Sequence, residues 1–248
     1  MTDLLTSVDA GELVQAAFKH VNAREYDAAR PLVNRALTLE PHTGTVAHVR
    51  AHLDTDSRAT ETGAAFLRQF LAAHDPFDGI NIHNAWHLAA LEFDLGNHDA
   101  ALDWYVRVVG PSVAEYPMTL YSAASLLWRI RVAGGERSLP WGQLRDTALK
   151  VGKAAGVENL GCGIAFITTE DDASLGTLID VLRGDDPTGI HTEVFVPVIH
   201  AFRAFWERDY AAAVMHFEPV AASFQRLSPF PEHRTPVEET YRAARAQL

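Results

Sequence analysis

The stretch that decides the fold is Leu13-Val14-Gln15-Ala16-Ala17-Phe18-Lys19-His20, which resumes after a turn as Tyr26-Asp27-Ala28-Ala29 and ends at Pro41. Its apolar and small residues recur every three or four positions, the period of a helix that packs by one face. Pro41 ends the second run, because proline cannot continue the hydrogen-bond ladder of a helix. The stretch predicts a helical hairpin with contact positions at Leu13, Ala16, Ala17, His20, Tyr26, Ala29, Val33 and Ala36.

The same hairpin is written at least twice more. One copy begins Ala85-Trp86-His87-Leu88-Ala89 and turns at Gly96-Asn97-His98-Asp99-Ala100-Ala101. Another runs from His200-Ala201 to Asp209-Tyr210-Ala211-Ala212-Ala213. Small residues where two antiparallel helices touch are typical of the tetratricopeptide repeat. The sequence therefore predicts an all-α fold, an α-solenoid of tetratricopeptide-like hairpins with a concave groove or pocket.

Most of the remaining chain has the pattern of further helices. We expect helices over about 43–55, 60–73, 81–95, 99–109, 118–133, 141–154, 192–208, 210–227 and 236–247. Gly110-Pro111 would close the hairpin before it, and Gly134–Pro140 would be a loop. No linker rich in glycine, serine or charge interrupts the chain, which predicts one repeat domain over residues 1–248.

Three places are less regular. The stretch 156–189 contains an apolar segment, 164–167, that suits a short strand, but Leu175, Leu178, Ile179 and Leu182 at helical spacing favour helix. Pro197 and Pro219 would shorten or kink their helices. The segment 228–231 would be a loop, and the polar cluster Glu232-His233-Arg234 after it would be a solvated loop or would fold back over a groove.

Charge and composition exclude several function classes. The 248 residues carry 21 basic and 32 acidic side chains, a net charge of −11, which argues against binding to nucleic acid or to an anionic membrane surface. Cys162 is the single cysteine, so no intrachain disulfide can form. Residues 1–5 show no basic region of a signal peptide, and no apolar run is long enough to span a bilayer. We expect a cytoplasmic protein.

Two His-x-x-x-His spacings are the main candidates for chemistry: His48 with His52, and His83 with His87. Four residues apart on a helix, two imidazoles share a face with about 6 Å between their Cβ atoms. Such a pair can hold a metal ion, but the glutamate of a zincin helix is absent. Histidines packed between helices are the alternative. We expect no cofactor, and keep a divalent metal as the alternative.

Both histidine pairs fall on the first helix of a hairpin, and first helices line the concave face of a tetratricopeptide stack. If these helices stack in register, His48, His52, His83 and His87 converge, with Trp86 beside them. The candidate acidic neighbours are Glu61, Glu92 and Asp94. Such a group would show perturbed pKa values and could perform acid–base chemistry. Alternatively, Trp86 is packing core and the carboxylates face solvent.

The segments His48-Val49-Arg50-Ala51-His52, Glu61–Leu67 and His83-Asn84-Ala85-Trp86-His87 resemble the tetratricopeptide repeat protein 38 family, and the order and spacing agree from about His48 to Arg131. The resemblance implies an all-helical repeat fold and a polar interior lined by histidine, and little about chemistry. Family members usually carry glutamate and glycine where this chain has Thr55 and Arg58. Family members also carry a later segment that contains a histidine, whereas the corresponding stretch of this chain, Gly161–Glu170, contains none.

Three functions follow as hypotheses. The leading one is binding of a small molecule or peptide in the groove, lined by His48, His52, His83, Trp86 and His87, with Arg50 or Arg129 available for a carboxylate. The rival is an enzyme of hydrolysis or cyclisation type. In it His83 or His87 would be the general base, oriented by Glu61 or Glu92, and a metal-assisted version would require the histidine pairs to meet. The third is a structural protein that forms a homodimer.

Overall fold

A computed structural model describes residues 9–134, 138–152, 156–228 and 230–248, and these ranges contain helices and turns but no strand. The chain divides into two compact units, unit 1 (Met1–Val109) and unit 2 (Gly110–Leu248), and each is described by itself. The all-α prediction is confirmed, whereas a single domain over residues 1–248 stays a prediction. The expectations for residues 1–5, 135–137, 153–154 and 229 lie outside the described residues.

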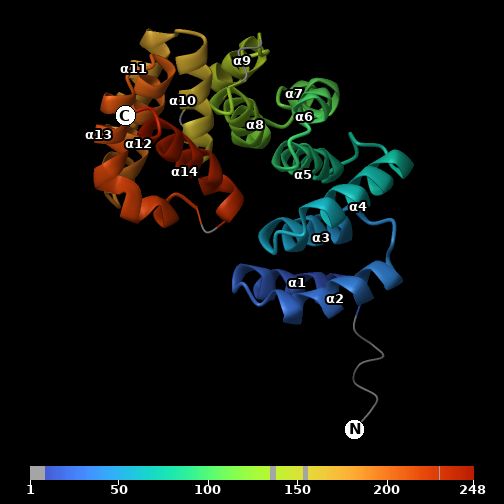
Figure 1. Cartoon of the computed structure of the whole chain (residues 1–248). Helices are drawn as coiled ribbons and strands as arrows, with labels where there is room; N and C mark the ends of the chain where they lie inside the picture. The colour runs from blue at the N-terminus through green and yellow to red at the C-terminus, as the bar shows by residue number, and fades with distance from the viewer. Residues whose placement is uncertain (1–8, 135–137, 153–155, 229) are drawn as a thin grey trace. The chain divides into compact units, whose positions relative to one another are not determined.

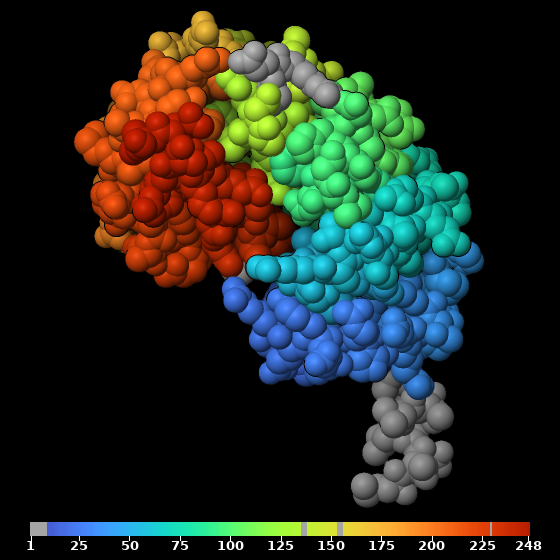
Figure 2. Space-filling view, in the orientation of Figure 1, coloured from blue at the N-terminus to red at the C-terminus, as the bar shows by residue number. Residues whose placement is uncertain are grey.

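Unit 1 is a succession of helical hairpins, drawn from blue to green in Figure 1. Its elements are α1 (Ala10–Asn22), α2 (Tyr26–Leu39), α3 (Gly44–Asp56), α4 (Thr60–Ala73), α5 (Asn81–Asp94), α6 (His98–Trp104) and the π-helical η1 (Tyr105–Val109). These bounds confirm the hairpins predicted over residues 13–109. The hairpins follow one another as a continuous stack in the space-filling view (Figure 2).

The first hairpin shows why these residues form these elements. The Asp9 carboxylate accepts a hydrogen bond from the Glu12 backbone N–H at 2.8 Å and caps the start of α1. Ala17, Ala29 and Ala36 are fully buried, so the backbones of α1 and α2 approach closely. Three of the predicted small-residue contacts therefore lie in the core of this hairpin, whereas the fourth, Ala16, is half-buried.

One turn geometry recurs at the end of the first helix in five described hairpins. The second residue after the helix takes a positive φ between 55° and 80°, and the next N–H bonds to the carbonyl five residues earlier at 2.8–2.9 Å. This is the Schellman arrangement, which satisfies carbonyls at the helix end. The residues with positive φ are Arg24, Arg58, Gly96, Glu170 and Arg208. The five hairpins therefore share one way of ending their first helix, as hairpins of a repeat fold would.

Unit 2 is also helical, and its helices are coloured green to red in Figure 1. Its elements are α7 (Gly110–Ser112), η2 (Pro117–Thr119), α8 (Leu120–Val132), α9 (Gly142–Val151), α10 (Glu158–Thr168), α11 (Asp172–Gly184), η3 (His191–Phe195), α12 (Val196–Trp206), α13 (Tyr210–Phe217), η4 (Glu218–Arg226) and α14 (Pro231–Arg245). Helix α10 is buried along nearly its whole length. At Gly161 an added Cβ would lie 2.9 Å from the backbone of Tyr121, so glycine is required where α10 crosses α8.

Several boundaries in unit 2 differ from the sequence expectation. The strand alternative for 164–167 is wrong, because these residues form the buried middle of α10. Gly110-Pro111 does not close the preceding hairpin, since one more helical turn follows. The last helix begins at Pro231 instead of 236, because proline suits the first turn of a helix. Residues 232–234 are therefore helical and half-buried, not a solvated loop.

The prolines act as expected. Before Pro197 the chain is π-helical, with the Val196 N–H bonded to the His191 carbonyl. After Phe217 the α-helix gives way to the 3₁₀ segment that contains Pro219. Each proline removes a backbone donor, so the regular hydrogen-bond ladder changes beside it.

Candidate metal centre

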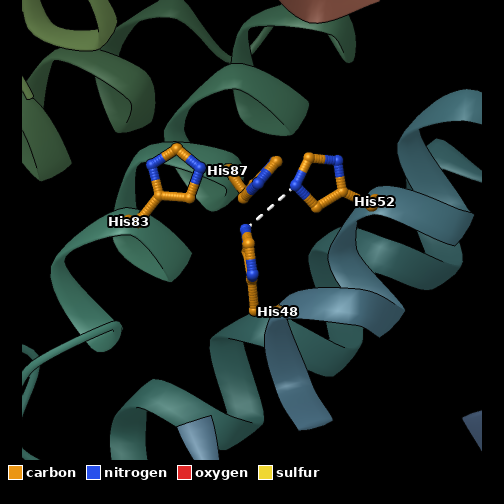
Figure 3. A group of neighbouring side chains, drawn as sticks. All are labelled: His48, His52, His83 and His87. Atoms are coloured by element: carbon orange, nitrogen blue, oxygen red, sulfur yellow. Dashed lines mark hydrogen bonds between the residues drawn. The ribbon is translucent and has the colours of Figure 1, made fainter. Parts of the chain in front are cut away.

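Helices α3 and α5 each contribute one histidine pair to a single cluster in unit 1. His48 and His52 come from α3, His83 and His87 from α5, and the four rings point toward one another (Figure 3). One ring nitrogen from each side chain can be chosen so that all four lie within 4.8 Å of one another. The convergence predicted from the stacking of first helices is therefore present.

The imidazoles are in direct mutual contact. Nε2 of His48 and Nε2 of His52 lie 2.9 Å apart, in a hydrogen bond whose direction depends on the tautomers. Across the two helices, the His52 and His87 ring centroids are 4.6 Å apart and those of His48 and His83 are 4.9 Å apart. The set thus spans two hairpins and is not two separate pairs.

The cluster is buried on one side and partly open on the other. His52 is 6% exposed and His87 is 1% exposed, whereas His48 and His83 are half-buried. Burial lowers the pKa of His48 to about 4, because a desolvated imidazolium is unfavourable. His48 is therefore neutral at pH 7, and a neutral imidazole is the form that binds metals.

Two aromatic side chains enclose the histidines. Trp86 stacks on His83, with centroids 5.1 Å apart and planes 18° apart, and meets His87 edge-on at 4.8 Å. Phe18 of α1 lies 5.5 Å from the His48 ring and 5.4 Å from the His52 ring. Phe18 was not predicted as a site residue. The signal that could have identified it is its position on the first helix of the first hairpin, since first helices line the concave face.

The predicted carboxylates do not join the cluster. Glu61 and Asp94 are exposed. Glu92 is buried, and its side chain binds Arg68 and Asn97. Glu92 therefore serves as a link between α4 and the turn after α5, and none of the three carboxylates lies in the four-histidine group.

The two predicted arginines are each bound to a carboxylate. Arg50 pairs with the fully buried Asp54 and lies over the Phe66 ring, 5.4 Å from its centroid. Arg129 belongs to unit 2, where its guanidinium binds Glu239 through two nitrogens at 2.7 and 2.8 Å. Arg129 links α8 to α14, whereas the Arg50 ion pair lies within α3 and its guanidinium packs on Phe66 of α4.

The distances between the imidazole nitrogens lie on either side of those in a four-coordinate site. Zinc binds imidazole nitrogens at 2.0–2.1 Å, so a tetrahedral site places the ligand nitrogens about 3.4 Å apart. The His48–His52 pair, at 2.9 Å, is slightly closer than this, and the widest pair, at up to 4.8 Å, is wider. To reach this spacing, side-chain rotations would have to separate the His48–His52 pair slightly and bring the wider pairs together. Donors that are all nitrogen suit zinc, copper, nickel or iron, and not magnesium or calcium.

Unit 2 has a polar interior of a different kind, which sequence reasoning did not single out. The Tyr121 hydroxyl donates to the His233 carbonyl, and the Tyr121 backbone N–H donates to the Glu158 carboxylate at 2.9 Å. Burial raises the pKa of Glu158 to about 7 and lowers that of His233 to about 4. Cys162 is also buried, and burial raises its pKa to about 12, so its thiol is not activated as a nucleophile.

Comparison with known structures supports the fold. The chain is similar to a tetratricopeptide repeat protein from Parabacteroides merdae ATCC 43184, with 15% sequence identity and a TM-score of 0.51. The alignment covers 95% of this chain and 98% of that chain. At this identity the likeness concerns the fold alone, and it confirms the tetratricopeptide-like prediction. No protein-family model matches the chain.

A helix needs about 20 predominantly apolar residues to cross a bilayer. Within the described ranges, no helix combines sufficient length with sufficient apolar character to cross a membrane.

Proposed function

We propose that this tetratricopeptide-like protein binds one divalent transition-metal ion, with zinc as the reference ion, through His48, His52, His83 and His87. The observation that carries the proposal is the approach of four ring nitrogens from two helices to within 4.8 Å. Four imidazoles placed on facing helices form a ready-made ligand set, since each pair already has the spacing that a helix gives to two metal ligands.

At His48 the electrostatics support a ligand role more than an acid–base role. A general base works best when its pKa lies near the working pH, and burial holds the pKa of His48 at about 4. For the predicted bases, His83 and His87, the buried carboxylate expected to orient them, Glu92, is bound to Arg68 and Asn97. A neutral imidazole that is a weak base toward protons can still donate its lone pair to a metal ion.

A small organic molecule or a peptide at the same histidines is the competing occupant. The half-buried positions of His48 and His83 give such a ligand a side from which to enter.

The same histidines and Trp86 carry the resemblance to the tetratricopeptide repeat protein 38 family, and we propose kinship with that family on this ground. A cytoplasmic location, inferred from sequence, fits a protein with one buried cysteine.

Isothermal titration of the metal-free protein with zinc tests the proposal. We expect one ion per chain in the wild type and a loss of affinity of at least about 100-fold in His52→Ala/His87→Ala, because two of the four side chains that would bind the ion are removed. The matched control is His42→Ala/His74→Ala, which removes another close histidine pair of unit 1, with ring centroids 5.4 Å apart. Equal zinc affinity in the wild type and the site variant would overturn the proposal, as would equal losses in both double variants.

A further inference from the structure

The charge balance of the proposed centre is incomplete. Four neutral imidazoles leave the two positive charges of a divalent ion uncompensated, and an uncompensated charge in a desolvated site is costly. The buried carboxylates of these helices have other partners: Glu92 binds Arg68, and Asp54 binds Arg50. The protein itself therefore supplies no anion among the four side chains that would hold the ion.

Trp86 presents a second, independent feature at the same place. It is 4% exposed, and its indole nitrogen is buried without a hydrogen-bond acceptor among the described residues. Buried indole N–H groups usually have a partner, because leaving one unsatisfied costs free energy. The ring lies against both His83 and His87, so the unsatisfied N–H belongs to a side chain that borders the cluster.

The partly open side of the cluster gives an exogenous group a way in. His52 and His87 form its buried side, and His48 and His83 are half-buried. Zinc sites can expand from four to five ligands when an exogenous group binds. An anion that enters beside His83 would bring both a negative charge to the ion and an acceptor to the indole N–H.

We propose that the metal bound at this centre takes an exchangeable carboxylate ligand, and that the indole N–H of Trp86 donates a hydrogen bond to that carboxylate. The inference rests on the proposed metal site and names the class of small molecule that the site would take. Trp86 acts as a specificity residue: it selects an anion with an acceptor oxygen and does not ligate the metal.

Cobalt(II) is the probe, because its visible absorption reports the number and type of its ligands. The full-length protein is loaded with cobalt and titrated with acetate. We expect a saturable change in the cobalt bands with one acetate per ion. In Trp86→Phe the aromatic ring remains and the N–H is lost, so the affinity of the cobalt-loaded protein for acetate should fall about tenfold. Trp104→Phe, in the same unit, is the matched control and should bind acetate like the wild type.

The outcomes separate the two proposals. If cobalt does not bind, the metal site itself is wrong and the carboxylate inference falls with it. If cobalt binds and acetate leaves the spectrum unchanged, the metal site stands and the carboxylate inference is overturned. If acetate binds equally well to the wild type and to Trp86→Phe, the role of the indole N–H is overturned.

Discussion

Two buried tryptophans show how differently the two units use polar groups. In unit 2, the Trp128 indole N–H donates to the Thr240 hydroxyl at 2.8 Å, from α8 to α14. In unit 1, Trp86 lies among imidazoles, and its N–H has no acceptor among the described residues. Trp128 is a structural link with its bonding completed inside the fold, whereas Trp86 borders a group that a ligand would complete.

The neighbours of these tryptophans extend the contrast. Around Trp128, Arg129 binds Glu239 and the Tyr121 hydroxyl binds the His233 carbonyl, so polar groups of α8 are matched one by one with groups of α14. Around Trp86, one kind of side chain is gathered at one point. In unit 2 the polar side chains bond in pairs that join helices, and such pairs explain stability. Four imidazoles in mutual contact are not needed for stability, which is why we assign the site to unit 1.

The largest effect is expected for Trp128→Ala in unit 2. The substitution empties a fully buried indole site and leaves the α14 partner without its donor. We expect a loss of about 3–5 kcal/mol in the free energy of unfolding, measured by urea denaturation. A loss below about 1 kcal/mol would show that the α8–α14 links are not structural and would break the comparison.

Glu158→Gln sharpens the account of unit 2 through its pH dependence. Because the pKa of Glu158 is raised from 4.5 to about 7, the folded state holds a proton that the unfolded state has lost, and this group lowers stability as pH rises from about 4.5 to 7. The glutamine still accepts from the Tyr121 N–H and does not ionise. We expect the free energy of unfolding of Glu158→Gln to exceed that of the wild type by up to about 3 kcal/mol at pH 8, and to equal it at pH 4.

His233 works in the opposite direction. Its pKa is lowered from 6.5 to about 4, so its contribution to stability is lost as pH falls from about 6.5 to 4, where the unfolded state binds the proton first. In the wild type, the dependence of stability on pH that comes from Glu158 and the opposite dependence that comes from His233 offset each other over much of this range. Thermal melts of Glu158→Gln should therefore show a steeper acid loss than those of the wild type, and an unchanged profile would contradict the assignment.

Zinc should stabilise unit 1 by mass action. At a free zinc concentration of 100 times Kd, the free energy of unfolding should rise by about 2.7 kcal/mol. Hydrogen exchange should place the added protection in α3 and α5, because these helices carry the ligands. Protection confined to unit 2, or equal protection in His52→Ala/His87→Ala, would count against the centre.

The smallest effect is expected for Trp86→Phe without metal. The substitution removes an N–H that has no acceptor among the described residues, and a phenyl ring can still stack on His83. The loss of stability should therefore be clearly smaller than that of the matched Trp128→Phe, which leaves Thr240 without its donor. Denaturation of both variants in urea checks this, and equal losses would remove the distinction between the two tryptophans.

The sequence predicted the hairpins well where small residues and turns recur, as in Leu13–Pro41 and Ala85–Ala101. It also predicted the meeting of His48, His52, His83 and His87, because a repeat fixes which helices stack. It could not place Glu92, since helical position alone does not show that Arg68 of another helix binds it. The links of unit 2 were invisible for a similar reason: Trp128 and Thr240 are separated by 112 positions.

Zinc K-edge X-ray absorption on the zinc-loaded protein tests the central claim most directly. The account predicts a first shell of nitrogen or oxygen at 2.0–2.1 Å, with the outer-shell scattering of several imidazoles, and loss of that pattern in His52→Ala/His87→Ala. A first shell containing sulfur at about 2.3 Å, or a shell without imidazole scattering, would show that the ion binds elsewhere and would contradict the account.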